Sequence, residues 1–334
     1  MKPIYVFSDV ESRIVKRMFE AIDVSPYADY HRFSDELRSK VSAHGMPAFL
    51  KNLSEQIAES RKDGCSIHVL ENCPVDEDLP YLGHVNPAAD KKREKKSFVA
   101  ESFMELISLI LGNPLISYSD RNDGDFFTDV ISLDRFRGGR SGFSDGDLVY
   151  HNDRASHPVR ADYIALLGMR CVPDDLTYTT YVDGRDILER LSESSRAALK
   201  VSCFVTDIDD RTREKNPDRK HSEPHAILSD DCAIRFIDTL TRPNVDAPRT
   251  ALEALLEFKD AISNAKKYRH RIKNGDLLIF SNQYGLHNRE RIEIPEDGAH
   301  DDRWLLKTYN FSSHQVAQKH ASHWVGSKFG CVSN

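Results

Sequence analysis

The stretch Val149-Tyr150-His151-Asn152-Asp153 is predicted to form the end of a β-strand. Side chains alternate between the two faces of a strand, so His151 and Asp153, two residues apart, are expected on the same face. An imidazole and a carboxylate held a few ångströms apart could bind a divalent metal ion. The His-x-Asp pattern is weak by itself, because a partly exposed histidine beside a turn aspartate gives the same pattern.

A third candidate ligand, His287, lies further along the chain. It follows an apolar strand predicted over residues 276–280 and a short polar loop, so we expect it at the mouth of a barrel. Two histidines and one carboxylate with open positions on the metal are characteristic of non-haem Fe(II) oxygenases. The open positions are enough for a bidentate 2-oxo acid and O₂.

Arg303 leads into the next predicted strand, Arg303-Trp304-Leu305-Leu306-Lys307. An arginine that enters a buried strand needs an anionic partner, and the distal carboxylate of 2-oxoglutarate would supply one. Thr179 and Thr180 could donate a hydroxyl to the same cosubstrate. The alternatives are a surface salt bridge for the arginine and plain β-propensity for the threonines.

Short β-rich segments separated by Gly, Asp and Ser turns surround these motifs. We predict strands at residues 126–133, 148–151, 163–169, 177–182, 200–206, 233–237, 276–280 and 304–310. Strands at this spacing favour a β-sandwich or barrel.

Helical patterns precede and interrupt the strands. Two consecutive helices are expected between residues 35 and 61, and further helices at 98–111, from about 186 to 199 and at 247–267. The core face of the last helix would carry Leu252, Leu255, Leu256, Phe258 and Ile262. The basic run 90–96 is interpreted as the solvated start of the helix at 98 rather than as a nucleic-acid patch.

These patterns predict an α+β chain with a single domain over residues 1–334. Residues 1–113 would form a mainly helical part that packs on the core. Residues 114–312 would form the β-core, which the resemblance described below implies is a jelly roll, with a helical insert at about 247–267 and a candidate lid at about 206–225.

The composition is that of a soluble globular protein: 334 residues, 40% hydrophobic and 30% charged. A net charge of −7 disfavours nucleic acid as the main partner. We find neither an apolar run of about 18 residues nor a secretory signal, so no membrane association is expected. Six scattered cysteines are interpreted as reduced, which favours the cytoplasm. We leave open whether the chain forms a homo-oligomer.

Taken together, the motifs resemble the clavaminate synthase-like branch of the Fe(II)/2-oxoglutarate oxygenases, which includes hydroxylases of free arginine, asparagine and lysine. The similarity covers roughly residues 35–312 and is carried by 74–80, 151–153, 179–181, 276–282, 287–289 and 303–305. The family fold is a double-stranded β-helix, a jelly roll with helices packed outside.

The resemblance implies that His151, Asp153 and His287 bind the iron. It implies that Arg303 clamps the C5 carboxylate of 2-oxoglutarate, with Thr179 as a supporting contact. The interval from His287 to Arg303 is slightly longer than in the family, so Arg289 is the alternative clamp. Lys307 stands where the family often has a second arginine, and a lysine cannot reproduce a bidentate fork for a substrate carboxylate.

The carboxylate of Asp153 also favours hydroxylation, because halogenases on this scaffold carry a small residue there. The polar segment that begins at Thr206 is a candidate lid, in which Asp207, Asp209 or Asp210 could contact a cationic substrate group. We expect hydroxylation of an unactivated C–H bond of a free L-amino acid, with L-lysine as first choice. Arginine, citrulline, ornithine, a carrier-tethered amino acid, and a non-enzymatic jelly-roll binding protein remain the alternatives.

Overall fold

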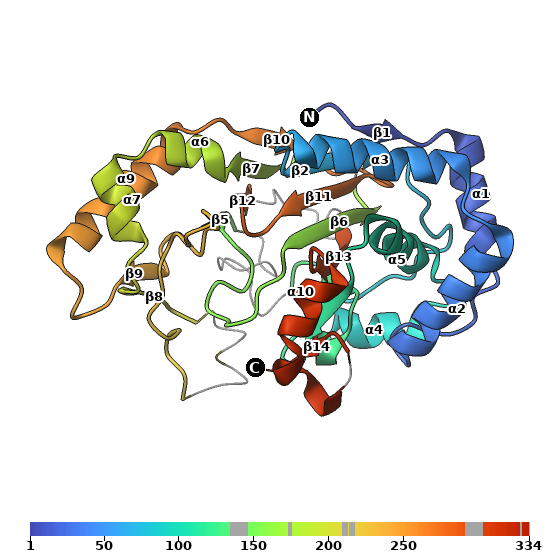
Figure 1. Ribbon diagram of the computed structural model, residues 1–334. Coiled ribbons are helices and arrows are strands. Elements are labelled where there is room, and N and C mark those ends of the chain that lie inside the picture. The colour runs from blue at the N-terminus through green and yellow to red at the C-terminus, as the bar shows by residue number, and fades with distance from the viewer. Residues whose placement is uncertain are drawn as a thin grey trace.

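A computed structural model of the chain describes residues 1–133, 146–172, 176–208, 213, 218–290, 303–327 and 329–333. Two large β-sheets lie between two groups of helices, one from the N-terminal third of the chain and one from residues 184–264, and a separate pair of short strands forms a third sheet (Figure 1). The chain therefore has a mixed α/β architecture.

The first part of the chain is mainly helical. Its elements are β1 (Tyr5–Val6), α1 (Asp9–Phe19), α2 (Tyr30–His44), α3 (Ala48–Lys62), β2 (Ile67–Glu71), α4 (Pro87–Glu94), α5 (Val99–Leu111), β3 (Leu115–Tyr118), η1 (Asn122–Gly124) and β4 (Thr128–Val130).

Most of the strands follow, and helices lie between them. The elements are β5 (Leu148–His151), β6 (Tyr163–Arg170), β7 (Thr179–Asp183), α6 (Gly184–Glu189), α7 (Glu193–Leu199), β8 (Phe204–Thr206), β9 (Thr241–Pro243), α9 (Arg249–Asn264), β10 (Tyr268–His270), β11 (Leu277–Ser281), β12 (Gly285–Arg289), β13 (Trp304–Asn310), α10 (His314–Lys319), η3 (Ala321–His323), η4 (Val325–Ser327) and β14 (Cys331–Val332).

The larger sheet has the strand order β1-β2-β11-β6-β13-β3-β14, and β4 pairs with β13. Its central strands are apolar without alternation: β11 reads Leu277-Leu278-Ile279-Phe280-Ser281 and is buried throughout. A strand covered on both faces has this composition.

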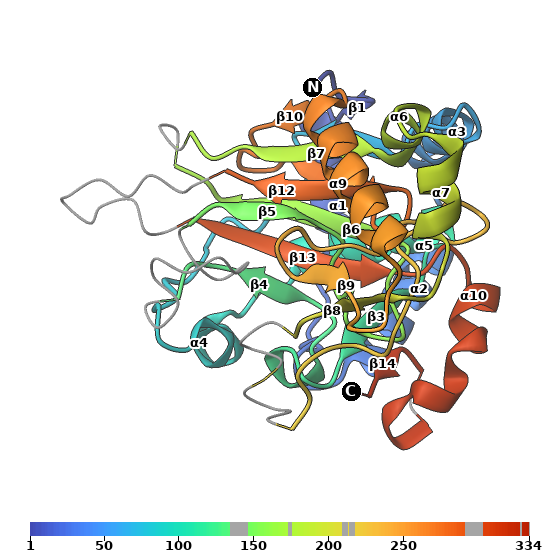
Figure 2. The same ribbon diagram turned by 90° about the vertical axis from the view of Figure 1, so that its left-hand side faces the viewer.

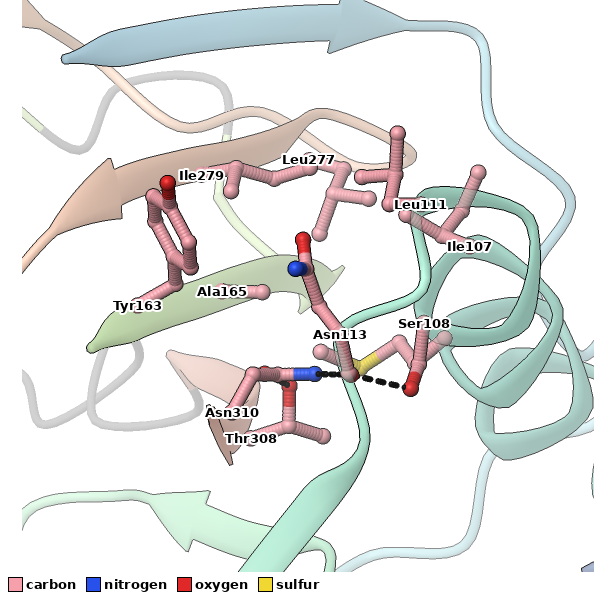
Figure 3. Close-up of a pocket in the computed structure, with 11 residues that line it drawn as sticks. Ile107, Ser108, Leu111, Asn113, Tyr163, Ala165, Leu277, Ile279, Thr308 and Asn310 are labelled. Carbon is pink, nitrogen blue, oxygen red and sulfur yellow. Dashed lines mark hydrogen bonds between the residues drawn. The ribbon is translucent and has the colours of Figure 1, made fainter. Parts of the chain in front are cut away.

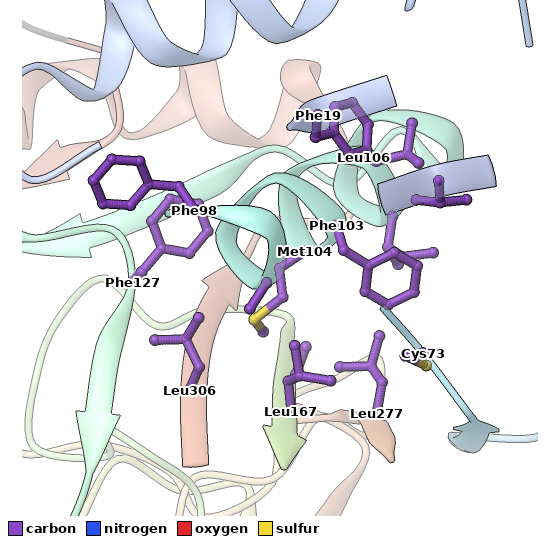
Figure 4. Close-up of a cluster of buried hydrophobic side chains, with 14 of the residues drawn as sticks. Phe19, Cys73, Phe98, Phe103, Met104, Leu106, Phe127, Leu167, Leu277 and Leu306 are labelled. Atoms are coloured by element: carbon purple, nitrogen blue, oxygen red, sulfur yellow. The ribbon is translucent and has the colours of Figure 1, made fainter. Parts of the chain in front are cut away.

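The N-terminal helices cover one face of this sheet. The helix α5 is buried on nearly every side, from Val99 to Ser108, so it is enclosed by other elements. Phe103 and Met104 of α5 lie over Leu167, Leu277 and Leu306, which come from three adjacent strands (Figure 4). This cluster fixes the helical layer on the sheet.

The smaller sheet has the order β10-β7-β12-β5, and three of its strands run side by side in Figure 2. Phe280 of the larger sheet contacts Tyr181 and His287 of the smaller one, with ring centroids 5.8 and 4.6 Å apart. The two sheets therefore pack face to face. Val182 and Leu286 point the other way, into a core formed with α6, α7 and α9.

Most of the predicted elements are present, with changes at their ends. The helix break expected near Gly45 is confirmed, and this glycine has a positive φ of 74°. The strand predicted at 233–237 forms only isolated bridges, and the helix expected up to residue 199 is two short helices. The sequence did not predict α1.

Two predictions of which side chains are buried and which are exposed were wrong. Leu252 and Leu256 of α9 are 49% and 55% exposed, whereas Leu255 and Phe258 are buried. The basic run 90–96 is not a solvated helix start, because Lys91 and Lys95 are buried and form ion pairs with carboxylates. Periodicity alone does not show that a charged residue has a buried partner.

No helix within the described ranges has both the length and the apolar character needed to cross a lipid bilayer.

Candidate metal centre

Three candidate metal-binding side chains meet where β5 and β12 pair. His151 ends β5 and lies directly opposite His287 of β12, with ring centroids 4.1 Å apart. Asp153 follows two residues after the end of β5, and its Oδ1 lies 3.2 Å from Nε2 of His151 and 4.0 Å from Nε2 of His287. One ligand atom from each residue lies within 4.8 Å of the others, so the three side chains could hold one metal ion.

The tautomer of His151 suits this role. Its Nδ1 lies 2.8 Å from the main-chain oxygen of Val149, and a carbonyl oxygen only accepts, so Nδ1 carries the proton. Nε2, on the other side of the ring, faces Oδ1 of Asp153 at 3.2 Å and is the nitrogen that a metal ion could reach. An imidazole nitrogen and a carboxylate oxygen this close together fit a divalent metal.

Two buried asparagines hold the loop that carries Asp153. The amide N–H of Asp153 donates to Oδ1 of Asn282 at 2.8 Å, and Nδ2 of Asn282 donates to the carbonyl oxygens of Asp153 and Ala161, both at 3.1 Å. Asn152 donates to the carbonyls of Asn282 and Gly285, both at 2.8 Å. Neither asparagine was predicted to have a role. The available signal was the position of Asn152 beside His151 and of Asn282 after the buried strand β11.

Lys307 of β13 crosses from the larger sheet to this centre. Its Nζ donates to Oδ2 of Asp153 at 2.7 Å and lies 4.6 Å from the ring centroid of Tyr309. Burial alone would raise the pKa of Asp153, but Lys307 and the two histidines outweigh burial and hold this pKa well below its usual range. Burial, and then the neighbouring His151, lower the pKa of His287. The centre thus offers an ionised carboxylate and a neutral imidazole at His287.

The residues expected to bind a 2-oxo acid are also buried. Arg303 directly precedes β13 and is 5% exposed. Thr179 begins β7 and pairs with Arg289 of β12, the alternative clamp. Arg289 is 6% exposed, and its Nη2 donates to the carbonyl oxygen of Gly146 at 2.8 Å. Neither arginine is a surface salt-bridge residue.

Only one of the three candidate lid aspartates lies within the described residues. Asp207 is half-buried and accepts a hydrogen bond from Arg242 at 3.2 Å. Asp209 and Asp210 lie outside the described residues.

One further ion pair beside the centre was not predicted. Arg154 follows Asp153 with a positive φ of 63°, and its Nη2 donates to Oδ2 of Asp120 at 2.9 Å. The guanidinium also covers the ring of Tyr118, 4.5 Å from its centroid. The sequence near Asp120 gives no pattern that would have identified this pair.

A small cavity lies on the opposite face of the larger sheet, between the sheet and α5. Residues of α5, β6, β11 and β13 line it, with Asn113 projecting toward its centre (Figure 3). Its volume of about 20 Å³ has room for about one water molecule. We therefore do not assign a substrate to it.

The match to a protein-family model decides the family. Residues 99–309 match the model described as taurine catabolism dioxygenase TauD, TfdA family. The chain belongs to this family. The predicted resemblance to Fe(II)/2-oxoglutarate-dependent oxygenases is confirmed: the chain is a dioxygenase whose cofactor is Fe(II) and whose cosubstrates are 2-oxoglutarate and O₂.

Curated proteins are similar to this chain over more than two thirds of its length. L-asparagine oxygenase of Streptomyces coelicolor is 27% identical over 80% of this chain and 77% of its own length. Clavaminate synthase 2 of Streptomyces clavuligerus is 27% identical over 85% of each chain. L-lysine 3-hydroxylase of Catenulispora acidiphila is 26% identical over 69% of this chain and 62% of its own length.

Solved structures share the fold over nearly the whole chain. Asparagine oxygenase in complex with Fe(II), 2S,3S-3-hydroxyasparagine and succinate superposes with a TM-score of 0.82 at 21% identity, covering 99% of both chains. The non-heme iron oxygenase OrfP in complex with Fe and alpha-ketoglutaric acid superposes with a TM-score of 0.77 at 18% identity, covering 98% of this chain and 99% of that one.

Proposed function

We propose that His151, Asp153 and His287 bind the catalytic Fe(II). The observation that carries this proposal is the convergence of the three side chains, with their possible ligand atoms within 4.8 Å of one another. The buried asparagines hold the loop of Asp153, and the Nδ1 proton of His151 leaves Nε2 free for the metal. Two imidazoles and one carboxylate leave positions open for further ligands.

We propose Arg303 as the residue that binds the C5 carboxylate of 2-oxoglutarate, with Thr179 as a supporting hydroxyl donor. A guanidinium can donate two parallel hydrogen bonds to a carboxylate, and the low exposure of Arg303 makes such a contact strong. Arg289 is the alternative, because it lies opposite Thr179 on the adjacent strand.

The proposed reaction is hydroxylation of an unactivated C–H bond of a free L-amino acid, with release of succinate and CO₂. Bound Fe(II) supplies the activation of O₂, and the chain's own residues hold and orient the two organic acids. The carboxylate of Asp153 would take the metal position that a halide takes where a small residue stands instead, which favours oxygen insertion. The amino-acid class is supported by the relatives, which include an asparagine oxygenase and a lysine hydroxylase.

L-lysine is our first candidate substrate, and arginine, citrulline, ornithine or a carrier-tethered amino acid are the alternatives. Lys307 could hold the substrate carboxylate, because an ammonium group has three donors and Asp153 takes one. Asp207, Asp209 or Asp210 could contact a cationic side chain of the substrate.

We also infer that the two packed sheets form a double-stranded β-helix within a single oxygenase domain over residues 1–334. The face-to-face packing of the sheets and the cover of helices on both sides support this architecture. The small-molecule substrate is the proposed partner.

The test is an amino-acid panel incubated with the purified protein, Fe(II), 2-oxoglutarate, ascorbate and O₂. The expected result is succinate together with a product heavier by one oxygen atom, formed with L-lysine or another basic amino acid and lost in His151→Ala. If no amino acid stimulates succinate formation, the substrate class is wrong. Full turnover by His151→Ala would contradict the metal assignment.

Two further comparisons separate the remaining alternatives. A free amino acid and the same residue on a carrier protein are assayed side by side. A protein that takes up no iron, and shows no visible charge-transfer band when 2-oxoglutarate is added without oxygen, would instead be a binding protein.

A further inference from the structure

A buried ion pair lies on the helical side of the strand that carries Arg303. Lys91 of α4 is fully buried, and its Nζ lies 2.7 Å from Oδ2 of Asp129 on β4, which is 3% exposed. The same ammonium donates to the carbonyl oxygen of Phe127 at 3.0 Å and lies 4.0 Å from the ring centroid of Tyr27. In Figure 2, α4 lies beside β4, which pairs with β13.

The other oxygen of Asp129 reaches the start of β13. The indole N–H of Trp304 donates to Oδ1 of Asp129 at 2.9 Å, and the tryptophan is 1% exposed. Trp304 is the next residue after Arg303. A continuous chain of contacts therefore runs from α4 through Asp129 to the backbone next to the proposed clamp.

The sheet itself fixes this end of β13 less strictly than the rest. Leu305 to Asn310 pair with β6 in one constant register, but the register shifts by one residue between Trp304 and Leu305. Trp304 lies opposite Arg170 and Leu305 opposite Gly168, so β6 has one extra residue there. Such irregularities bend a strand and redirect its side chains, so an additional anchor is needed to set the direction of Arg303.

Net stability alone is a weak explanation for this ion pair. Burying two charges costs about as much as their attraction returns, and an apolar pair of similar size is often as stable. An apolar pair, however, could not accept a hydrogen bond from the indole N–H of Trp304.

We propose that Asp129, held by Lys91 and bound to Trp304, is a positioning residue that orients Arg303 for binding of 2-oxoglutarate. This inference rests on the proposed function, in which Arg303 binds the C5 carboxylate. The contact acts on the cosubstrate and not on the metal, because Asp129 and Trp304 lie on the helical side of the larger sheet and the three metal-binding residues belong to the smaller sheet and its loop.

The first test replaces the indole by a ring without a donor. In Trp304→Phe the dissociation constant of 2-oxoglutarate, titrated without oxygen through the visible band of the Fe(II) complex, is expected to rise about tenfold. The dissociation constant of Fe(II) in the absence of 2-oxoglutarate should not change. In turnover, KM for 2-oxoglutarate should rise more than kcat falls.

The second test keeps Trp304 and changes its acceptor. Lys91→Met with Asp129→Asn removes both charges but retains an acceptor oxygen for the indole, and it should bind 2-oxoglutarate as the unmodified protein does. Lys91→Met with Asp129→Leu removes the acceptor as well, and it should show the same weakening as Trp304→Phe. Rescue by the asparagine distinguishes a directed hydrogen bond from general packing.

A matched control lies in the same helical layer. Lys95 pairs with Glu101 at 2.9 Å, and both groups are fully buried. Among the described residues, their hydrogen bonds and ion pairs do not reach β13. Glu101→Gln should lower the melting temperature without changing the affinity for 2-oxoglutarate.

Arg303→Ala distinguishes failure of the positioning role from failure of the clamp assignment. If it weakens 2-oxoglutarate binding while Trp304→Phe and the leucine variant do not, the positioning role is wrong and the clamp stands. If Arg303→Ala binds 2-oxoglutarate as tightly as the unmodified protein, the clamp assignment is wrong and the positioning role falls with it.

Discussion

At the scale of single residues, Lys307 joins the metal centre to the opposite sheet through its 2.7 Å contact with Asp153. A fixed positive charge this close to a bound cation repels it, so Lys307→Met is expected to tighten Fe(II) binding by about tenfold. Lys307→Arg keeps the charge and should change the affinity little. The measurement is an anaerobic Fe(II) titration of the three proteins. Weaker binding by Lys307→Met would mean that the lysine mainly orients the carboxylate.

Asn282 provides a second prediction at this scale. Asn282→Ala leaves the amide N–H and the carbonyl oxygen of Asp153 without this buried partner, whereas Gln283 still donates to the carbonyl oxygen of Ala161. The free energy of unfolding should therefore fall by about 3 kcal/mol, and metal affinity should fall as well. Asn310 is a matched control, since it is also buried and hydrogen-bonded but belongs to the helical side of the sheet. Asn310→Ala should cost stability and leave metal affinity intact. Equal metal affinity in both variants would contradict the role assigned to Asn282.

At the scale of elements, α9 separates buried from exposed apolar positions. Phe258 is fully buried against the smaller sheet, and Phe258→Ala is expected to lower the free energy of unfolding by about 3–5 kcal/mol. Leu256→Ala, on the exposed side of the same helix, should stay within about 0.5 kcal/mol. Urea denaturation of the two variants checks this, and a large loss from Leu256→Ala would show that this side is covered in solution.

Sequence patterns predicted the positions of helices and strands better than they predicted which face of each is buried. The period of α9 was visible, but five apolar positions over three turns did not show which side the sheet would cover. The strands β6, β11 and β13 were predicted closely because each contains an apolar run, at residues 164–167, 277–280 and 304–306. Short pieces such as β9 and β10 are defined by their partners rather than by their own residues, so periodicity could not reveal them.

The candidate metal centre was predictable because its residues are chemically distinctive and because His151 and Asp153 lie two residues apart at the end of a predicted strand. The sequence suggested His151, Asp153 and His287, and the structure brings them together. The roles of Asn152 and Asn282 and the contact of Lys307 with Asp153 were not predicted, since these contacts are made only by folding. Lys91 is the clearest case: its neighbours in sequence are charged, and its partner Asp129 is distant along the chain.

At the scale of the whole molecule, three buried histidines predict sensitivity to acid. Burial first, and a neighbouring arginine second, lower the pKa of His68, His157 and His225 to about 4. Between the usual pKa of 6.5 and about 4, the unfolded chain binds protons that the folded chain does not. Stability is therefore complete above pH 6.5 and falls as the pH drops toward 4, by up to about 3 kcal/mol for each histidine.

Urea denaturation of metal-free protein between pH 7.5 and pH 4.5 measures this loss. His157→Gln should reduce the dependence on pH, because its side chain cannot take up a proton. A free energy of unfolding that stays constant over this range would contradict the low pKa values.

Because the two sheets are separate, substitutions in one sheet can change binding of the organic acids without replacing the proposed metal-binding residues of the other. The proposed metal-binding residues belong to the smaller sheet and its loop, whereas Lys307 lies on β13 of the larger sheet and Arg303 directly precedes that strand. Substitutions on that strand can alter which acids are held while the metal-binding residues stay as they are. The ion pair of Lys307 with Asp153 connects the two sheets. A substitution at position 307 that changes substrate specificity would therefore also change the binding of the metal ion.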